Sequence, residues 1–84
     1  MILTPVFAPD ARSQWLKLDI DLQERLLDEM EMLAAAPPID SHVSHMRDFV
    51  VQRQSERCYI FFQSVVDPRN ATLTVTGVQH VVTR

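Results

Sequence analysis

The sequence predicts an α+β domain with the element order β-α-α-β-β-β, in which a helical hairpin packs on one face of a small, twisted, mainly antiparallel sheet. Three observations predict it: an amphipathic helical stripe over residues 21–35, β-rich runs after residue 47, and turn-forming residues between those runs. The chain has 84 residues, 46% apolar and 23% charged. These values are typical of one globular domain, which we expect to span residues 1–84.

The chain opens with a β-rich run over residues 2–7, which we predict to be the first strand. Pro5 has no N–H to donate, so this strand belongs at an edge of the sheet. The pattern leaves open whether it pairs in the parallel or the antiparallel sense. Asp10 is expected to be the N-cap of a first helix over residues 11–18, in which Trp15 and Leu18 share one face.

The clearest helix is predicted over residues 21–35. Asp21 and Glu24 have the spacing of a capping box at its start, and Pro37-Pro38 ends it. Its apolar residues recur at helical spacing, so they predict one buried stripe made of Leu22, Leu26, Met30 and Leu33. Such a stripe is typical of core packing rather than of a cofactor site.

Three strands are predicted in the second half, over residues 48–53, 58–66 and 72–81. The second of these is apolar on both faces, as expected of a central strand. Asp67-Pro68 has the chemistry of a type I turn, which makes the last two strands a hairpin. Alternation in the last strand predicts that Leu73, Val75 and Gly77 point to one face.

The charge is unevenly distributed along the chain. Residues 1–41 carry eight acidic and three basic residues, whereas residues 42–84 carry three acidic and five basic residues. This asymmetry is expected either of a basic functional face on an acidic scaffold or of helices that place acids toward solvent. The net charge of −3 does not favour tight, sequence-independent binding to nucleic acid, which requires many basic contacts.

The sequence also argues against a disulfide-bonded, a membrane-spanning or a secreted protein. The single cysteine, Cys58, cannot form an intrachain disulfide, and we expect a protein of the reducing cytoplasm. No apolar run approaches the roughly 20 residues that a membrane-spanning helix needs, and the first ten residues lack the basic start of a signal peptide. We therefore expect no membrane association.

The element order resembles that of the RelE/ParE toxin superfamily over almost the whole chain. The resemblance rests on the opening VFAPDARSQWLKLD, the second helix ending in AAAPP, the segment Met46-Arg47-Asp48, and RCYIFFQSVVDPRNATLTVTGVQHVV. Three features depart from the pattern. Val81 replaces the arginine that usually follows the last-strand histidine, and the C-terminal helix and tyrosine of the family have no counterpart in the sequence.

The resemblance implies the toxin of a type II toxin–antitoxin module, of the kind that includes plasmid-stabilisation systems. RelE-like members cleave mRNA on the ribosome, whereas ParE-like members inhibit DNA gyrase, so the fold does not decide between these targets. A cognate antitoxin is the expected partner, and a homo-oligomer or a toxin–antitoxin hetero-oligomer is the expected assembly. The alternative is a non-toxic or decayed interaction module with the same fold.

Candidate site residues lie in the second half. If the domain cleaves RNA, we expect His80 to transfer protons, Arg57 to hold the scissile phosphate and Tyr59 to stack on a base or donate a proton. Arg53 and Arg47 are candidates for binding the nucleic acid or another target. No lysine follows Lys17, so the basic set is depleted and we favour binding over cleavage.

Each of these candidates also has a structural interpretation. A histidine at the end of a strand, an arginine at a sheet edge and a tyrosine in a strand commonly serve solubility or packing. His42 and His45 have the spacing of a metal pair only within a helix, but they lie in a predicted loop without a third ligand. We expect neither a metal nor a cofactor.

Overall fold

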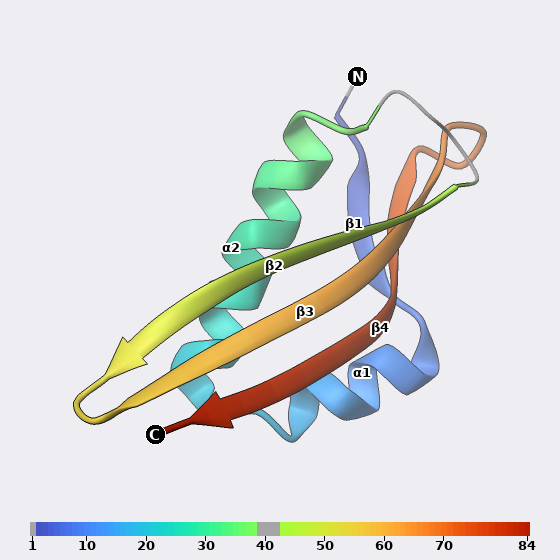
Figure 1. The fold of residues 1–84 in the computed structure, drawn as a ribbon. Helices are drawn as coiled ribbons and strands as arrows, with labels where there is room; N and C mark the ends of the chain where they lie inside the picture. Colours follow the sequence, from blue (N-terminus) through green and yellow to red (C-terminus); the bar gives the residue numbers. More distant parts are fainter. Residues whose placement is uncertain (1, 39–42) are drawn as a thin grey trace.

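The computed structural model describes residues 2–38 and 43–84, and Figure 1 shows its fold. The elements follow the chain as β1 (Thr4–Phe7), α1 (Pro9–Leu16), α2 (Ile20–Ala35), β2 (Ser44–Arg53), β3 (Glu56–Asp67) and β4 (Thr72–Thr83). This order confirms the predicted β-α-α-β-β-β arrangement. No helix in the described part of the chain is long and apolar enough to cross a membrane.

The four strands form one sheet in the order β1-β4-β3-β2. β2, β3 and β4 make an antiparallel meander, and β1 joins it beside β4 in the parallel sense, which settles the pairing direction that the sequence left open. β2 begins four residues earlier than predicted, because Ser44 to Arg47 continue the ladder with β3 as far as Val65. The antiparallel part of the sheet is therefore longer than the β-rich run alone indicated.

The helices and the sheet enclose a single hydrophobic core. The predicted stripe of α2 is buried against the sheet, where it meets Ile60, Phe62, Leu73 and Val75, and all of these strand side chains are almost fully buried. Both helices lie on the same side of the sheet, so the other face of β2, β3 and β4 is uncovered and is turned toward the viewer in Figure 1. We call this uncovered surface the open face.

Both helices begin earlier than predicted. α1 has Ala8 as its N-cap with Pro9 in the first turn, so Asp10 is inside the helix and is not its cap. α2 has Asp19 as its N-cap, and no side chain caps either helix. Asp21 therefore lies within the first turn, and the predicted capping box with Glu24 is wrong. A carboxylate in that turn still stabilises the helix, because its negative charge interacts favourably with the positive end of the helix dipole.

Two contacts fix the angle between the helices. The indole Nε1 of Trp15 donates to the backbone oxygen of Gln23 at 3.1 Å, and the Gln23 amide donates back to the backbone oxygen of Trp15 at 3.2 Å. The centroids of the Trp15 and Phe7 rings also lie 5.1 Å apart. The end of β1, α1 and α2 are thus joined around one aromatic side chain, which keeps the indole N–H paired while its ring packs against the core.

A β-bulge interrupts the pairing of β3 with β4. Gln63 is paired with Gly77 and the next residue, Ser64, with Val75, which leaves Thr76 as the extra residue. The bulge shifts the alternation, so that Leu73, Val75 and then Val78 face the core. The prediction that Gly77 points the same way as Leu73 and Val75 is therefore wrong, and Gly77 lies on the open face.

Beyond the bulge, the outer edge of β4 is bordered by α1 instead of β1. The parallel pairing with β1 ends at Val75, whose backbone oxygen accepts from the N–H of Ala8 at 2.9 Å. Further along, the N–H of Val78 donates to Oε1 of Gln14 at 2.8 Å. The Gln14 side chain of α1 therefore supplies the hydrogen-bond acceptor for Val78 that a neighbouring strand would otherwise provide.

We predict that Gln14→Leu destabilises the fold by about 1–3 kcal/mol, because it leaves the part-buried N–H of Val78 without an acceptor. The measurement is the free energy of unfolding in urea. Gln63→Leu is the matched control, since the exposed Gln63 side chain makes no hydrogen bond with described residues, and it should change stability by less than about 0.5 kcal/mol. Equal effects of the two substitutions would contradict a role for Gln14 at the edge.

Candidate functional site

The candidate site residues divide between the two faces of the sheet according to strand alternation. Side chains that are directly opposite in the register share a face. The open face carries four successive rows from β2, β3 and β4, which are Met46-Gln63-Gly77, Asp48-Phe61-Gln79, Val50-Tyr59-Val81 and Gln52-Arg57-Thr83. The helix-covered face carries the buried residues Cys58, Ile60 and Phe62 of β3.

Arg57 and Tyr59 lie on the open face. The Nε of Arg57 donates to Oε1 of Gln52 at 3.1 Å, and the Gln52 amide in turn donates to the backbone oxygens of Gln54 and Glu56. Arg57 is thus anchored at the β2–β3 hairpin while its side chain remains exposed. Tyr59 is half-buried between Val50 on β2 and Val81 on β4.

His80 lies on the other side of the sheet. It is opposite Ile60, whose side chain faces the core, and it is exposed near the end of β4. It makes no hydrogen bond or ion pair with the residues that the structure describes. The sheet itself therefore separates His80 from Arg57 and Tyr59. The structure brings the arginine and the tyrosine together but does not place the histidine with them.

Arg53 is held in a salt-bridge cluster with α2. Its Nη1 lies 2.8 Å from Oδ2 of Asp19, its Nε donates to Asp21 at 3.1 Å, and its Nη2 contacts the same Asp21 carboxylate. Hydrogen bonds to Asp19 and then Asp21 raise the pKa of Arg53 above its ordinary value. Arg53 therefore joins the end of β2 to the start of α2. Because its Nε, Nη1 and Nη2 all contact these carboxylates, the guanidinium is already engaged within the fold.

Arg47 lies on the same side of the sheet as Arg53 but is exposed, opposite Phe62 in the register. Among the strand residues of the open face in the described part of the chain, Arg57 is the only basic one. The face is therefore mainly apolar and amide-bearing. This composition differs from the cluster of cations that stabilises a phosphorane-like transition state.

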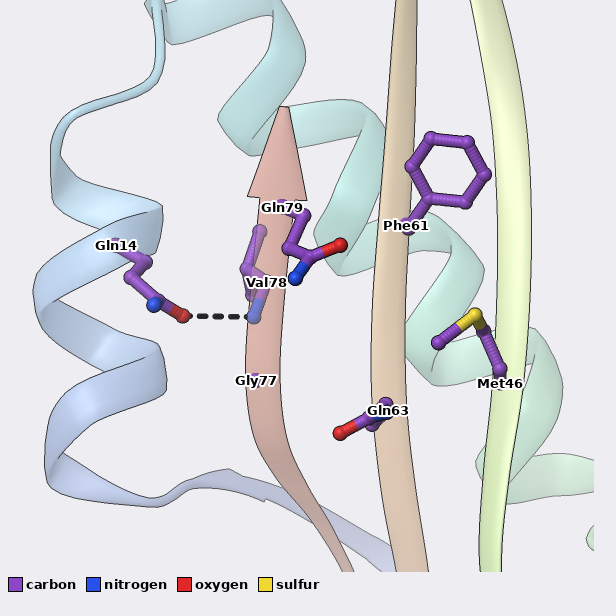
Figure 2. Close-up of a pocket in the computed structure, with 7 residues that line it drawn as sticks. All are labelled: Gln14, Met46, Phe61, Gln63, Gly77, Val78 and Gln79. Atoms are coloured by element: carbon purple, nitrogen blue, oxygen red, sulfur yellow. Dashed lines mark hydrogen bonds between the residues drawn. The ribbon is translucent and has the colours of Figure 1, made fainter. Parts of the chain in front are cut away.

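A pocket of about 70 Å³ lies on the open face, beside the bulge (Figure 2). Its walls hold three carboxamides together with apolar side chains and no charged group, and its lining is Gln14, Met46, Phe61, Gln63, Gly77, Val78 and Gln79. In Figure 2 the dashed line marks the bond from Val78 to Gln14. A pocket of this chemistry suits an uncharged group rather than a phosphate or a metal ion.

The sequence interpretation did not single out the residues of this pocket. They come together only because the bulge turns Gly77 to the open face and because Gln14 of α1 reaches the edge of β4. A Cβ at Gly77 would meet Oε1 of Gln63 at 3.6 Å, an ordinary contact, so the glycine is not required by space there. The one signal in the sequence was a glycine inside a strand pattern, which often marks a bulge.

In the part of the chain that the structure describes, no group of three or more histidine, cysteine or carboxylate side chains is placed so that it could hold a metal ion. His45 lies in β2, so it is not on a helix, and His42 lies outside the described residues. The buried Ser64 hydroxyl has no hydrogen-bond partner within the described structure. Cys58 is a free, buried thiol in β3.

Comparisons with known proteins bear on the fold. No protein-family model matches the sequence, and no curated protein matches it. A chain in the crystal structure of the intact E. coli RelBE toxin–antitoxin complex is similar in structure, with a TM-score of 0.63 and 16% sequence identity over 90% of this chain and 93% of that one. The chain therefore has a RelE-like fold, as the sequence resemblance implied.

We predict that Arg53→Ala and Asp21→Ala each lower the melting temperature, and that the double variant loses less than the sum, because both remove the same ion pair. The loss should remain well below that of Leu26→Ala, a fully buried truncation that costs about 2–5 kcal/mol. High salt should reduce the loss of melting temperature in the Arg53 and Asp21 variants, since solvent reaches this ion pair.

The matched control is Arg47→Ala, an exposed arginine on the same strand and the same side of the sheet. It should leave the melting temperature nearly unchanged. Additive losses in the double variant would show that Arg53 and Asp21 do not act together.

Proposed function

We propose that this protein is the toxin-like component of a type II toxin–antitoxin module, and that it acts on its target by binding rather than by cleaving RNA. The RelE-like fold supports the general class. The single observation that supports binding over cleavage is the division of the candidate residues by the sheet, with Arg57 and Tyr59 on the open face and His80 on the other.

The chemistry of cleavage explains why this division matters. An attack by a 2′-hydroxyl needs a base at that hydroxyl, cations at the phosphate and an acid at the leaving oxygen, all within hydrogen-bond reach of one phosphate. A phosphate held by Arg57 on the open face is separated from His80 by the thickness of the sheet. Of the candidate residues, only Tyr59 lies beside Arg57 on the open face.

An antitoxin protein is the partner that we propose. The outer edge of β2 supports it, because this ten-residue strand is the last in the sheet order and is paired with β3 on one side without a bulge. Such an edge offers a row of backbone donors and acceptors to an extended segment of a partner. The proposed compartment is the cytoplasm, where ribosomes and gyrase, the two proposed targets, are found.

Expression of this protein alone should slow bacterial growth, and coexpression of a small adjacent gene that encodes the antitoxin should restore it. Growth is measured as optical density after induction, with the folded protein confirmed in the soluble fraction. Unimpaired growth despite soluble, folded protein would favour the alternative of a decayed interaction module.

We predict that His80→Ala leaves the toxicity unchanged, because His80 does not share a face with Arg57. Primer extension on cellular mRNA after induction provides the second readout, and we expect no codon-phased cuts with either protein. If cleavage did depend on His80 as a general acid or base, the substitution would reduce it by about 10²–10⁴-fold. Cuts that disappear in the His80→Ala protein would contradict the binding proposal.

A further inference from the structure

The open face exposes a continuous apolar surface. Val50, Tyr59 and Val81 form one row across β2, β3 and β4, with Val50 47% and Val81 49% exposed. Phe61 is half-buried in the adjacent row, and Met46 of the row beyond is 57% exposed. In Figure 2, Phe61 and Met46 project from β3 and β2 on the side away from α2. A contiguous exposed apolar surface of this kind is typical of an interaction site.

Two charges of opposite sign flank the central row. Asp48 belongs to the row on one side, opposite Phe61, and Arg57 belongs to the row on the other side, opposite Gln52. They are the only charged residues in the four rows of the open face. The open face is therefore electrostatically complementary to itself, because the acid lies on one side of the apolar central row and the base lies on the other side.

We propose that this open face packs against the open face of a second copy of the chain, about a twofold axis that runs across the strands along the row Val50-Tyr59-Val81. The rotation exchanges the two flanking rows. Each Arg57 then lies beside the partner's Asp48, while the apolar central rows meet each other. This inference is independent of the proposed toxin function.

The charges favour a twofold axis across the strands over one that runs along β3. An axis along β3 would place Arg57 over the partner's Arg57, a like-charge contact that costs association energy. With the axis across the strands, the two Arg57 side chains are about four residues apart along the strand direction, or roughly 13 Å. That separation exceeds the Debye length of about 8 Å at physiological ionic strength, so their repulsion is screened.

The same composition disfavours a nucleic acid as the occupant. A phosphate backbone needs several cations, and the four rows of this face offer one arginine together with one aspartate. Three strands about 4.8 Å apart and rows about 6.8 Å apart give a contact of only a few hundred Å² on each protomer. This area is at the small end for specific interfaces, so the association is weak and depends on concentration.

The test is sedimentation velocity of the purified chain from about 10 μM to about 1 mM, the range in which a weak interface dissociates. We expect a reversible shift from monomer to dimer, and Val81→Glu should abolish it. Ile20→Glu is the matched control, because Ile20 is 69% exposed on α2, away from the open face, and it should leave the dimer intact.

A charge reversal tests the axis itself. Asp48→Arg should raise the dissociation constant about tenfold, because it sets two arginines against each other. The double variant Asp48→Arg with Arg57→Asp should restore the wild-type value. A wild-type chain that stays monomeric throughout the range overturns the proposal, as does a dimer that survives Val81→Glu. Failure of the double variant to restore association overturns the pairing of Asp48 with Arg57.

Discussion

The bulge at Thr76 in β4 is the constraint on which much of this structure depends. Before it, β4 lies between β1 and β3 and sends Leu73 and Val75 into the core. After it, the alternation has shifted by one residue, so Val78 enters the core and Gly77 turns to the open face. Without the extra residue, Gly77 would take the core position that Val78 fills, because a one-residue slip exchanges the two faces of a strand.

The bulge also marks the point where β1 is replaced as the neighbour of β4. The short β1 ends at Phe7, and the chain turns directly into α1, whose Gln14 accepts from the N–H of Val78. Trp15, one residue further on, joins this helix to α2 through Gln23. The bulge, the end of β1 and the position of the helical hairpin are thus coupled through two adjacent residues of α1.

The placement of charge explains what kind of surface the fold presents. Arg53 is occupied by Asp19 and Asp21 at the start of α2, and Arg25 lies with its guanidinium carbon 5.1 Å from the centre of the Phe49 ring. These cations stabilise the contact between β2 and α2. The open face keeps Arg57 and Asp48 amid apolar and amide side chains, and the proposed self-association rests on this composition.

The sequence by itself determined the element order, the stripe of α2 and the three-stranded meander, because these depend on local periodicity and turn chemistry. It also indicated that β1 belongs at an edge, since Pro5 cannot donate to a ladder. The candidate site was only partly predictable: the residue types of Arg57, Tyr59 and His80 were visible, but the faces on which they lie were not. The tertiary structure decided the faces, the parallel pairing of β1 and the pocket beside Gly77, because register, a bulge and the reach of Gln14 arise from pairing between segments far apart in the chain.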